Sequence, residues 1–208
     1  MSRCFIYGAG GFASVVFDTA EICGFEISGF IDDFSNGADR SFCDRPVYSA
    51  GVLQEGDVVF MGFGNNPMRQ KKGNELLQRG IRMPALIHPA AVVSRLATVG
   101  EGCFIGATAV VDPLCRIGRF TILNKGSIIG HQTVIGEAAN ICPGVALAGN
   151  VEISDLVWIG IGSTVIEKIK IAGNVYIGGG AVVVKDITEE DSLYFGVPAV
   201  LRKMKHDN

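Results

Sequence analysis

The chain has 208 residues, 48% of them hydrophobic, which is enough for one large domain or two modest ones with a real core. Its formal net charge of −3 excludes the broad basic field that holds nucleic acid or an anionic membrane. Glycine follows the first short apolar stretch too soon for a signal peptide, and no later run reaches membrane-spanning length. We therefore expect a cytoplasmic protein with no nucleic-acid or membrane partner.

The six cysteines are scattered along the chain without a CxxC pair: Cys4, Cys23, Cys43, Cys103, Cys115 and Cys142. This spacing favours free thiols over a disulfide framework or a zinc site. We expect no metal.

The first residues predict a β-α-β unit. Residues 3–7 are expected to form a strand, Gly8-Ala9-Gly10-Gly11 a tight turn and residues 12–23 a helix. A second strand at 26–31 ends in Asp32 and Asp33. Glycines at this place let a phosphate or a sugar approach backbone amides at a helix N-terminus, although the motif alone equally fits a plain turn. Asp32 and Asp33 could likewise simply end the strand.

A third strand is predicted at 57–62, followed by a helix that runs to about residue 79. Asn66 can cap this helix and Pro67 can open it. Residues 1–85 would then form a Rossmann-like α/β domain that is too short for a complete dinucleotide-binding fold.

From residue 87 onward the sequence repeats every six residues. Seventeen consecutive positions in this register are Ile, Val or Leu: Ile87, Val93, Val99, Ile105, Val111, Ile117, Leu123, Ile129, Ile135, Ile141, Leu147, Ile153, Ile159, Val165, Ile171, Ile177 and Val183. Neither a helical nor an alternating pattern has this period. The repeat therefore predicts a parallel β-helix over residues 86–208, ending in a C-terminal tail.

Small or medium residues stand four positions after most of these aliphatics, as Thr133 does after Ile129, and Gly126, Gly144, Gly162 and Gly180 recur every eighteen residues. Glycine tolerates the positive φ that sharp corners often need. Three hexads are therefore expected to form one triangular coil, and the whole repeat nearly six coils. Cys103 and Cys115 fall at small interior positions and are interpreted as packing residues.

Several motifs together resemble one family over nearly the whole chain: GAGG at 8–11, FIDD at 30–33, GFGNNPMR at 62–69, LIHP at 86–89, the hexads and FGVPA at 195–199. The family is the hexapeptide-repeat sugar N-acetyltransferases of the bacillosamine-pathway and NeuD type. The resemblance implies a left-handed β-helix, a homotrimer and acetyl-CoA in clefts between subunits. It also implies a nucleotide-linked 4-amino-4,6-dideoxyhexose as substrate, with UDP slightly favoured over dTDP or GDP.

Acetyl transfer to an amine needs a proton acceptor and donors that stabilise the tetrahedral oxyanion. The chain has three histidines, His88, His131 and His206. His131 comes two residues after an inward aliphatic, so it should point outward from a coil corner. From its position in the repeat alone, a histidine at a coil corner is more often a solvated surface residue without a catalytic role. The resemblance instead makes His131 the general base and Asn124 a positioning residue for the amino sugar. It makes Gly149 the oxyanion donor, although the sequence alone fits a plain corner glycine equally well, and it makes Asn140 and Gly149 cofactor contacts. It also implies a nucleotide-sugar pocket lined by Gly8, Gly10, Gly11, Asp32 and Asp33, with further contacts from Asn65 and Arg69.

Three residues depart from the family pattern: Gln132 replaces an acidic residue, Asn140 a second histidine and Phe12 the histidine that follows GAGG. These departures leave open an alternative function, a non-catalytic trimer that binds nucleotide-sugars or serves as a scaffold. A γ-type carbonic anhydrase, which needs three histidines on zinc, is a more distant alternative because only His131 lies in the body of the repeat.

Overall fold

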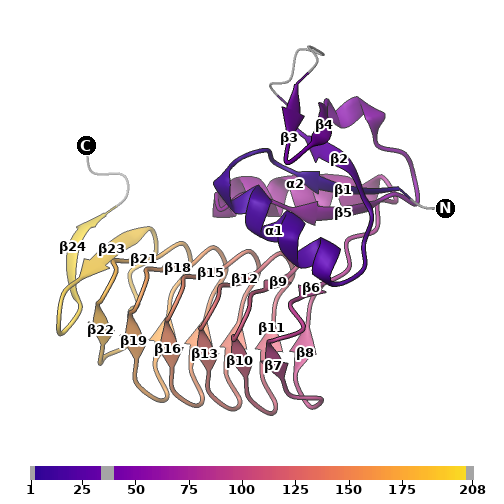
Figure 1. The fold of residues 1–208 in the computed structure, drawn as a ribbon. Helices are drawn as coiled ribbons and strands as arrows, with labels where there is room; N and C mark the ends of the chain where they lie inside the picture. Colours follow the sequence, from indigo (N-terminus) through magenta and orange to yellow (C-terminus); the bar gives the residue numbers. More distant parts are fainter. Residues whose placement is uncertain (1–2, 34–39, 205–208) are drawn as a thin grey trace.

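The structure is a computed structural model that describes residues 3–33 and 40–204. The N-terminal part is a five-stranded sheet in the order β3-β4-β2-β1-β5, flanked by two helices (Figure 1). Its elements are β1 (Cys4–Tyr7), α1 (Gly11–Ile22), β2 (Ile27–Ile31), β3 (Ser41–Phe42), β4 (Arg45–Tyr48), the 3-10 helix η1 (Ala50–Val52), β5 (Val58–Met61) and α2 (Asn66–Gln78). All strand pairs are parallel except β3 with β4.

The two helices lie on opposite faces of this sheet. All residues of β1 and β5 are buried, as expected for parallel strands covered on both sides. Helix α1 packs against the side chains of Ile6 and Phe30, and α2 packs against the alternate residues Phe5 and Ile31. The predicted cap of α2 is off by one residue, since it is the Asn65 side chain that accepts from the N–H of Met68, at 2.9 Å.

The remainder of the chain is the predicted β-helix, in which each two-residue strand begins six residues after the previous one. The strands are β6 (Leu86–Ile87), β7 (Val92–Val93), β8 (Thr98–Val99), β9 (Phe104–Ile105), β10 (Val110–Val111), β11 (Arg116–Ile117), β12 (Ile122–Leu123), β13 (Ile128–Ile129), β14 (Val134–Ile135), β15 (Asn140–Ile141), β16 (Ala146–Leu147), β17 (Glu152–Ile153), β18 (Trp158–Ile159), β19 (Thr164–Val165), β20 (Lys170–Ile171), β21 (Tyr176–Ile177) and β22 (Val182–Val183). The hexad aliphatic is the second residue of each strand. From Ile105 onward these side chains are buried in one continuous core. The predicted architecture, an α/β domain followed by a β-helix, is confirmed.

Three faces and three corners make up the prism. The domain face consists of β6, β9, β12, β15, β18 and β21; the apolar face of β7, β10, β13, β16, β19 and β22; and the charged face of β8, β11, β14, β17 and β20. The charged face takes its name from Arg116, Glu152 and Lys170. Corner glycines such as Gly126 and Gly144 have φ of 69° and 68°, the left-handed geometry that the eighteen-residue spacing predicts.

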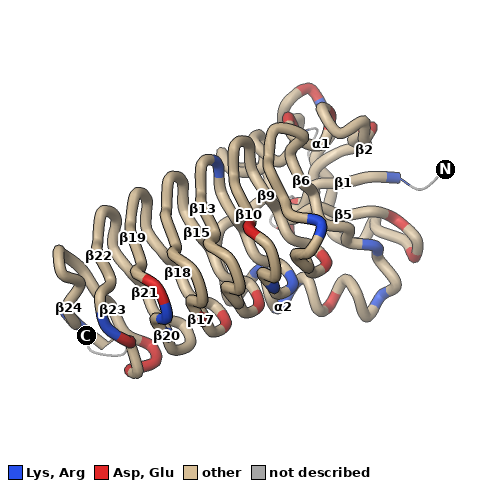
Figure 2. The backbone as a smooth tube through the Cα atoms, turned by 90° about the horizontal axis from the view of Figure 1, so that it is seen from below, with Lys and Arg blue, Asp and Glu red and all other residues tan. Residues whose placement is uncertain are grey.

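The apolar face presents the first residue of each strand outward, and none of these residues is charged: Val92, Val110, Ile128, Ala146, Thr164 and Val182. Val92 is 64% exposed and Ile128 is 48% exposed. In the view from below, β10, β13, β19 and β22 carry no acidic or basic residue (Figure 2).

The last coil ends in an antiparallel hairpin of β23 (Ser192–Phe195) and β24 (Val200–Met204), which extends the domain face. The hexad pattern did not predict this hairpin. His206 lies outside the described residues.

The α/β domain stands on the first coils of the domain face, with β5 as its nearest strand (Figure 1). Phe12 of α1 meets Phe104 edge-on at 5.3 Å between ring centroids. On the other side, Gly73 of α2 lies so close to Phe120 that an added Cβ would come within 2.5 Å of the ring. These contacts join the two parts into one packed unit.

Arg69 ties the two parts together from inside. Its side chain is fully buried, and its guanidinium donates to the carbonyl oxygens of Phe120 at 2.7 Å, Ala138 at 2.8 Å and Ala139 at 3.1 Å. It also donates to Oδ1 of Asn66, whose amide donates to the carbonyl of Leu156. The expectation that Arg69 contacts substrate is therefore wrong, because no part of the side chain reaches solvent.

Arg69→Met should destabilise the protein by about 3 kcal/mol, since several buried carbonyls would lose their donor and each such loss costs about 1–3 kcal/mol. Burial lowers the pKa of Arg69 to about 10, so the wild-type guanidinium remains charged at neutral pH. Denaturant unfolding would measure the change. Arg79→Met is the control, because the Arg79 guanidinium bonds the carbonyl of Leu53 from an exposed position. An equal loss of unfolding free energy in the two variants would contradict the stabilising role of the buried Arg69 hydrogen bonds.

Candidate functional site

His131 lies at the corner between the apolar face and the charged face, which we call the His131 corner. Its side chain is exposed, as predicted. Gly149 lies on the next coil, eighteen residues on, and its N-terminal neighbour Ala148 directly follows β16. A Cβ built on Gly149 would lie 2.5 Å from Nε2 and 2.6 Å from Cε1 of His131. The imidazole therefore lies directly against the Gly149 backbone.

Gln132 contacts the other nitrogen of this imidazole. Its Oε1 is 3.1 Å from His131 Nδ1. If Nδ1 carries the proton and donates to this oxygen, Nε2 keeps its lone pair and faces Gly149. A neutral carboxamide can thus orient the ring without the charge that a carboxylate would add.

The backbone around Gly149 offers a free donor. Its carbonyl accepts from the N–H of Lys168 at 3.1 Å. Across the described ranges, no backbone or side-chain acceptor is paired with the N–H of Gly149. Gly130 on the preceding coil allows this close stacking, because a Cβ there would lie 2.7 Å from the nitrogen of Gly149. The corner therefore combines a proton acceptor with an unused N–H donor.

Asn124 and Asn140 are not brought to this corner within the chain. Asn124 lies at the opposite edge of the apolar face, at the corner shared with the domain face, where its Oδ1 accepts from the N–H of Lys125. Asn140 is on the domain face, 4% exposed, in register with Ile122 and Trp158. Gly149 and Asn140, both expected to contact cofactor, thus lie on different sides of the prism.

In the α/β domain the predicted glycines divide into two kinds. Gly8 has φ of 110°, and a Cβ there would lie 3.0 Å from the carbonyl oxygen of Gly62, so the fold itself requires this glycine. A Cβ on Gly10 or Gly11 would meet nothing within 4 Å. Neither the backbone nor packing explains these two glycines, and both lie at the start of α1.

Asp32 and Asp33 follow β2 at the carboxyl edge of the sheet, beside the glycine turn. Asp32 forms an ion pair with Arg40 at 2.6 Å. Asp33 accepts from the hydroxyl of Tyr7 at 2.6 Å and pairs with Lys72 at 3.0 Å. Burial alone would raise the pKa of Asp33, but these partners lower it. Burial also raises the pKa of Tyr7 to about 12, so this hydroxyl remains a donor at neutral pH. Sequence reasoning missed Tyr7 and Lys72, because contacts across 26 and 39 residues leave no local signal.

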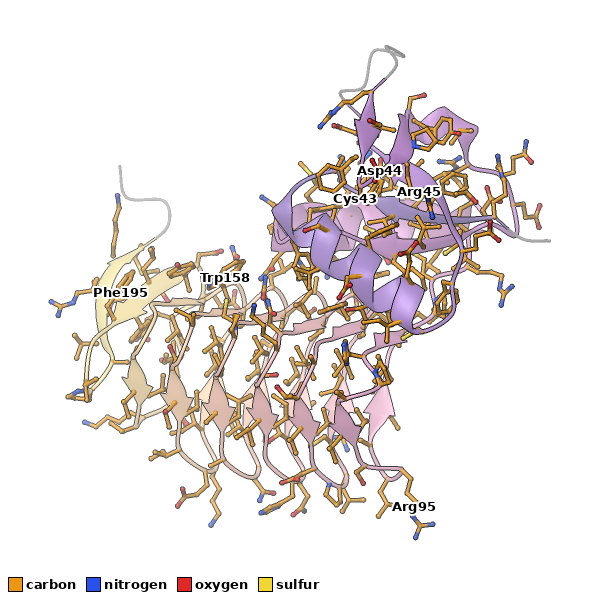
Figure 3. The ribbon with its side chains drawn as sticks, in the orientation of Figure 1. Cys43, Asp44, Arg45, Arg95, Trp158 and Phe195 are labelled. Atoms are coloured by element: carbon orange, nitrogen blue, oxygen red, sulfur yellow. The ribbon has the colours of Figure 1, made fainter. Side chains whose placement is uncertain are left out.

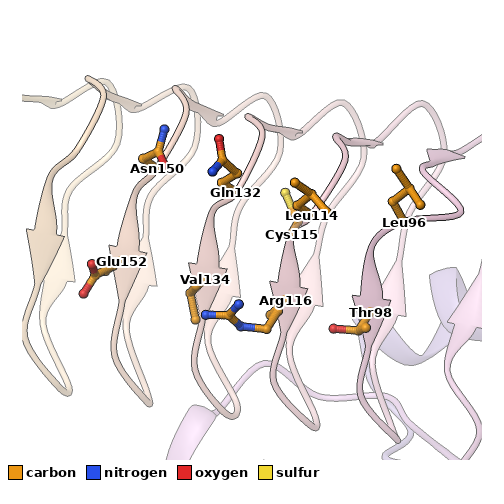
Figure 4. A pocket seen from close by; sticks show the side chains of 9 residues that line it. All are labelled: Leu96, Thr98, Leu114, Cys115, Arg116, Gln132, Val134, Asn150 and Glu152. Atoms are coloured by element: carbon orange, nitrogen blue, oxygen red, sulfur yellow. The ribbon is translucent and has the colours of Figure 1, made fainter.

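A groove and a cavity lie beside several of the candidate site residues. A groove of about 530 Å³ runs along the His131 corner on the charged face, and Gln132 and Asn150 point into it next to Leu114 (Figure 4). A cavity of about 480 Å³ lies between the start of α2 and the β-helix, lined by Asn65 and Trp158. Trp158 occupies the angle between the two parts of the molecule (Figure 3). Asn65 reaches this cavity as its expected role requires, although its Oδ1 is used as the cap.

Within residues 3–33 and 40–204, no three His, Cys, Asp or Glu side chains are grouped so that they could hold a metal ion. None of the described helices combines the length and the apolar character needed to cross a membrane.

Comparison with known proteins decides the family. Residues 3–76 match the model of the PglD N-terminal domain. PerB from Caulobacter crescentus, whose crystal structure contains CoA and GDP-perosamine, is 30% identical with a TM-score of 0.89, and the match covers 98% of both chains. The chain belongs to the hexapeptide-repeat sugar N-acetyltransferases. The acetyltransferase domain of PglB from Neisseria gonorrhoeae, in complex with acetyl coenzyme A, is likewise 30% identical (TM-score 0.88) over 97% of this chain and all of that one.

The His131 corner and the glycine turn of the α/β domain fit two different requirements of a sugar N-acetyltransferase. The His131 corner carries an acceptor and a donor of the type that acyl transfer needs. The glycine turn lies where ligands bind in open α/β sheets, at the carboxyl ends of the strands. WeeI from Acinetobacter baumannii, 24% identical with a TM-score of 0.88 over 97% of this chain, has the same fold.

Proposed function

We propose that this enzyme transfers the acetyl group of acetyl-CoA to the 4-amino group of a nucleotide-linked 4-amino-4,6-dideoxyhexose. The observation that carries the proposal is the imidazole of His131 lying against Gly149, whose N–H is unused. The likeness to PerB, which holds CoA and GDP-perosamine, supports both substrates.

The chemistry follows from this corner. The amine nitrogen attacks the thioester carbonyl carbon while Nε2 of His131 accepts the amine proton. The carbonyl oxygen becomes an oxyanion and accepts from the N–H of Gly149. When the C–S bond breaks, the proton on His131 passes to the leaving sulfur, and the products are the amide and CoA.

The complete site requires a second copy of the chain. His131 and Asn124 flank the two edges of the uncharged apolar face, so one protomer cannot bring them together. Three copies that direct this face toward a common axis would place the His131 corner of one beside the Asn124 corner of the next. We therefore propose a homotrimer with the reacting amine between subunits, positioned by Asn124 of the neighbour.

The α/β domain would hold the nucleotide end of the substrate. Gly10 and Gly11 leave room for a phosphate at the start of α1, and Asp32 and Asp33 lie beside them. Resemblance at the sequence level favours UDP, whereas the likeness to PerB favours GDP.

Release of free CoA thiol with UDP-, dTDP- and GDP-linked 4-amino sugars tests the proposal and selects the nucleotide. Sedimentation of the same sample tests the trimer. Thiol release with none of the sugars would contradict the acetyl transfer and leave a binding protein, while a monomer at micromolar concentration would contradict the shared site.

Gly10→Val should abolish nucleotide-sugar binding while leaving the fold intact, because its side chain would enter space that is open in the protein and that the ligand must occupy. Calorimetry should show at least a tenfold weaker affinity for the sugar nucleotide, about 1.4 kcal/mol or more, with acetyl-CoA binding unchanged. Gly51→Ala is a control outside the turn, since its nearest neighbour atom would be 3.9 Å away. Unaltered sugar binding by Gly10→Val would place the pocket elsewhere.

A further inference from the structure

A hydroxyl inside the prism contacts the peptide that carries the Gly149 N–H. Thr133 is fully buried, and its Oγ1 donates to the carbonyl oxygen of Ala148 at 3.2 Å. Oγ1 of Thr133 in turn accepts from the N–H of Val151 at 3.3 Å. The carbonyl of Ala148 and the N–H of Gly149 belong to one planar peptide group.

The two ends of a trans peptide point in opposite directions. Because Thr133 holds the carbonyl of Ala148 toward the interior, the N–H of Gly149 must point outward, on the side where His131 lies. A hydrogen bond to the carbonyl also polarises the peptide and strengthens its N–H as a donor.

A second corner of the same prism shows what such a peptide can bind. Thr121 donates to the carbonyl of Gly136 at 2.8 Å and accepts from the N–H of Ala139 at 3.1 Å, which repeats the Thr133 arrangement. The N–H of Glu137, in the peptide that Thr121 holds, donates to a carboxylate oxygen of Asp155 at 2.7 Å. An outward N–H held in this way therefore binds a negatively charged oxygen.

We infer that Thr133 is a positioning residue for acetyl transfer, which aims the N–H of Gly149 at the oxyanion from inside the β-helix. The inference rests on the proposed function of the His131 corner. Thr133 is fully buried and therefore out of reach of either substrate. Within the described part of the chain, no side chain accepts from the N–H of Gly149 as Asp155 accepts from the N–H of Glu137.

Thr133→Val removes the hydroxyl while keeping the shape of the side chain, and Thr121→Val is its matched control. Losing a whole oxyanion donor costs about 10²–10³ in kcat, so a misaimed donor should lower kcat about 10-fold or more. KM should stay within about twofold, because the oxyanion exists only in the transition state. The pH profile should not move, since Nε2 of His131 is untouched. Thr133→Ser should restore most of kcat, and Thr121→Val should lose a similar amount of thermal stability yet keep kcat within about twofold.

Three results would overturn the inference: a kcat for Thr133→Val within about twofold of wild type, an equal loss in Thr121→Val, or a shifted acid limb, which would mean that Thr133 acts through His131. A crystal structure of Thr133→Val gives a readout without activity. We expect the Ala148–Gly149 peptide to rotate from its wild-type orientation, and an unchanged orientation would also contradict the inference. Failure of the wild type to acetylate any sugar would contradict the proposed function, and the crystal structure would still test the peptide.

Discussion

Replacing His131 by alanine should slow acetylation on the order of 10²–10⁴-fold, the usual range for a positioned general base. The ring is exposed and, among the described residues, its side-chain hydrogen bond is to Gln132, so its removal should leave the fold and the assembly unchanged. Because a neutral amine can attack the thioester without a base, a loss near the lower end of this range is also consistent with the role of His131.

Steady-state kinetics with the true sugar over a range of pH would measure this effect. His88→Ala is the control, because the His88 ring accepts from the N–H of Ala90 far from Gly149, and its kcat should remain near wild type. Gln132→Glu should move the acid limb of the rate profile to higher pH, since a carboxylate beside Nδ1 favours the charged imidazolium. Nearly full kcat and an unmoved pH profile in His131→Ala would transfer the role of base to water or to another residue.

Gly149→Ala should lower kcat on the order of 10²-fold, because its Cβ would need the space that the His131 ring occupies. Displacing a reacting group by about 1 Å can cost this much. Gly149 is not among the residues with positive φ, so its backbone accepts alanine, and the damage should be confined to the corner.

Gly173→Ala is the matched control for this substitution. It is also a corner glycine, but its Cβ would come no closer than 3.8 Å to any neighbour atom. We expect normal kcat for Gly173→Ala and normal thermal unfolding for both variants. A fully active Gly149→Ala enzyme would show that the ring and the glycine do not act together.

The β-helix could be predicted from sequence because its long-range contacts repeat a local rule. Each strand pairs with the strand eighteen residues away, so the register of Ile129 fixes that of Leu147 and of every later coil. The same spacing makes His131 and Gly149 neighbours, and their contact was therefore within reach of sequence reasoning.

Other contacts do not follow from any period. Asn124 is only seven residues from His131, yet the two lie at opposite edges of the apolar face, because β13 runs across this face between them. The family resemblance implies a substrate contact for Arg69, whereas the carbonyl groups that its guanidinium binds lie 51 to 70 residues away in the sequence and leave no local signal. The hexad pattern predicts Thr133, four positions after Ile129, only as a small or medium interior residue, because the sequence does not show where its hydroxyl points.

Trp158 gives the protein an optical reporter at its most informative place. It is the sole tryptophan of the chain, half-buried, stacked on Tyr176 at 6.0 Å, with its ring edge near Gly64 of the other domain. Its intrinsic fluorescence therefore samples one location, the seam where the α/β domain meets the β-helix. A change in Trp158 emission would therefore report a change in hydration at the contact between the two domains. Domain docking can thus be observed in solution without an attached dye.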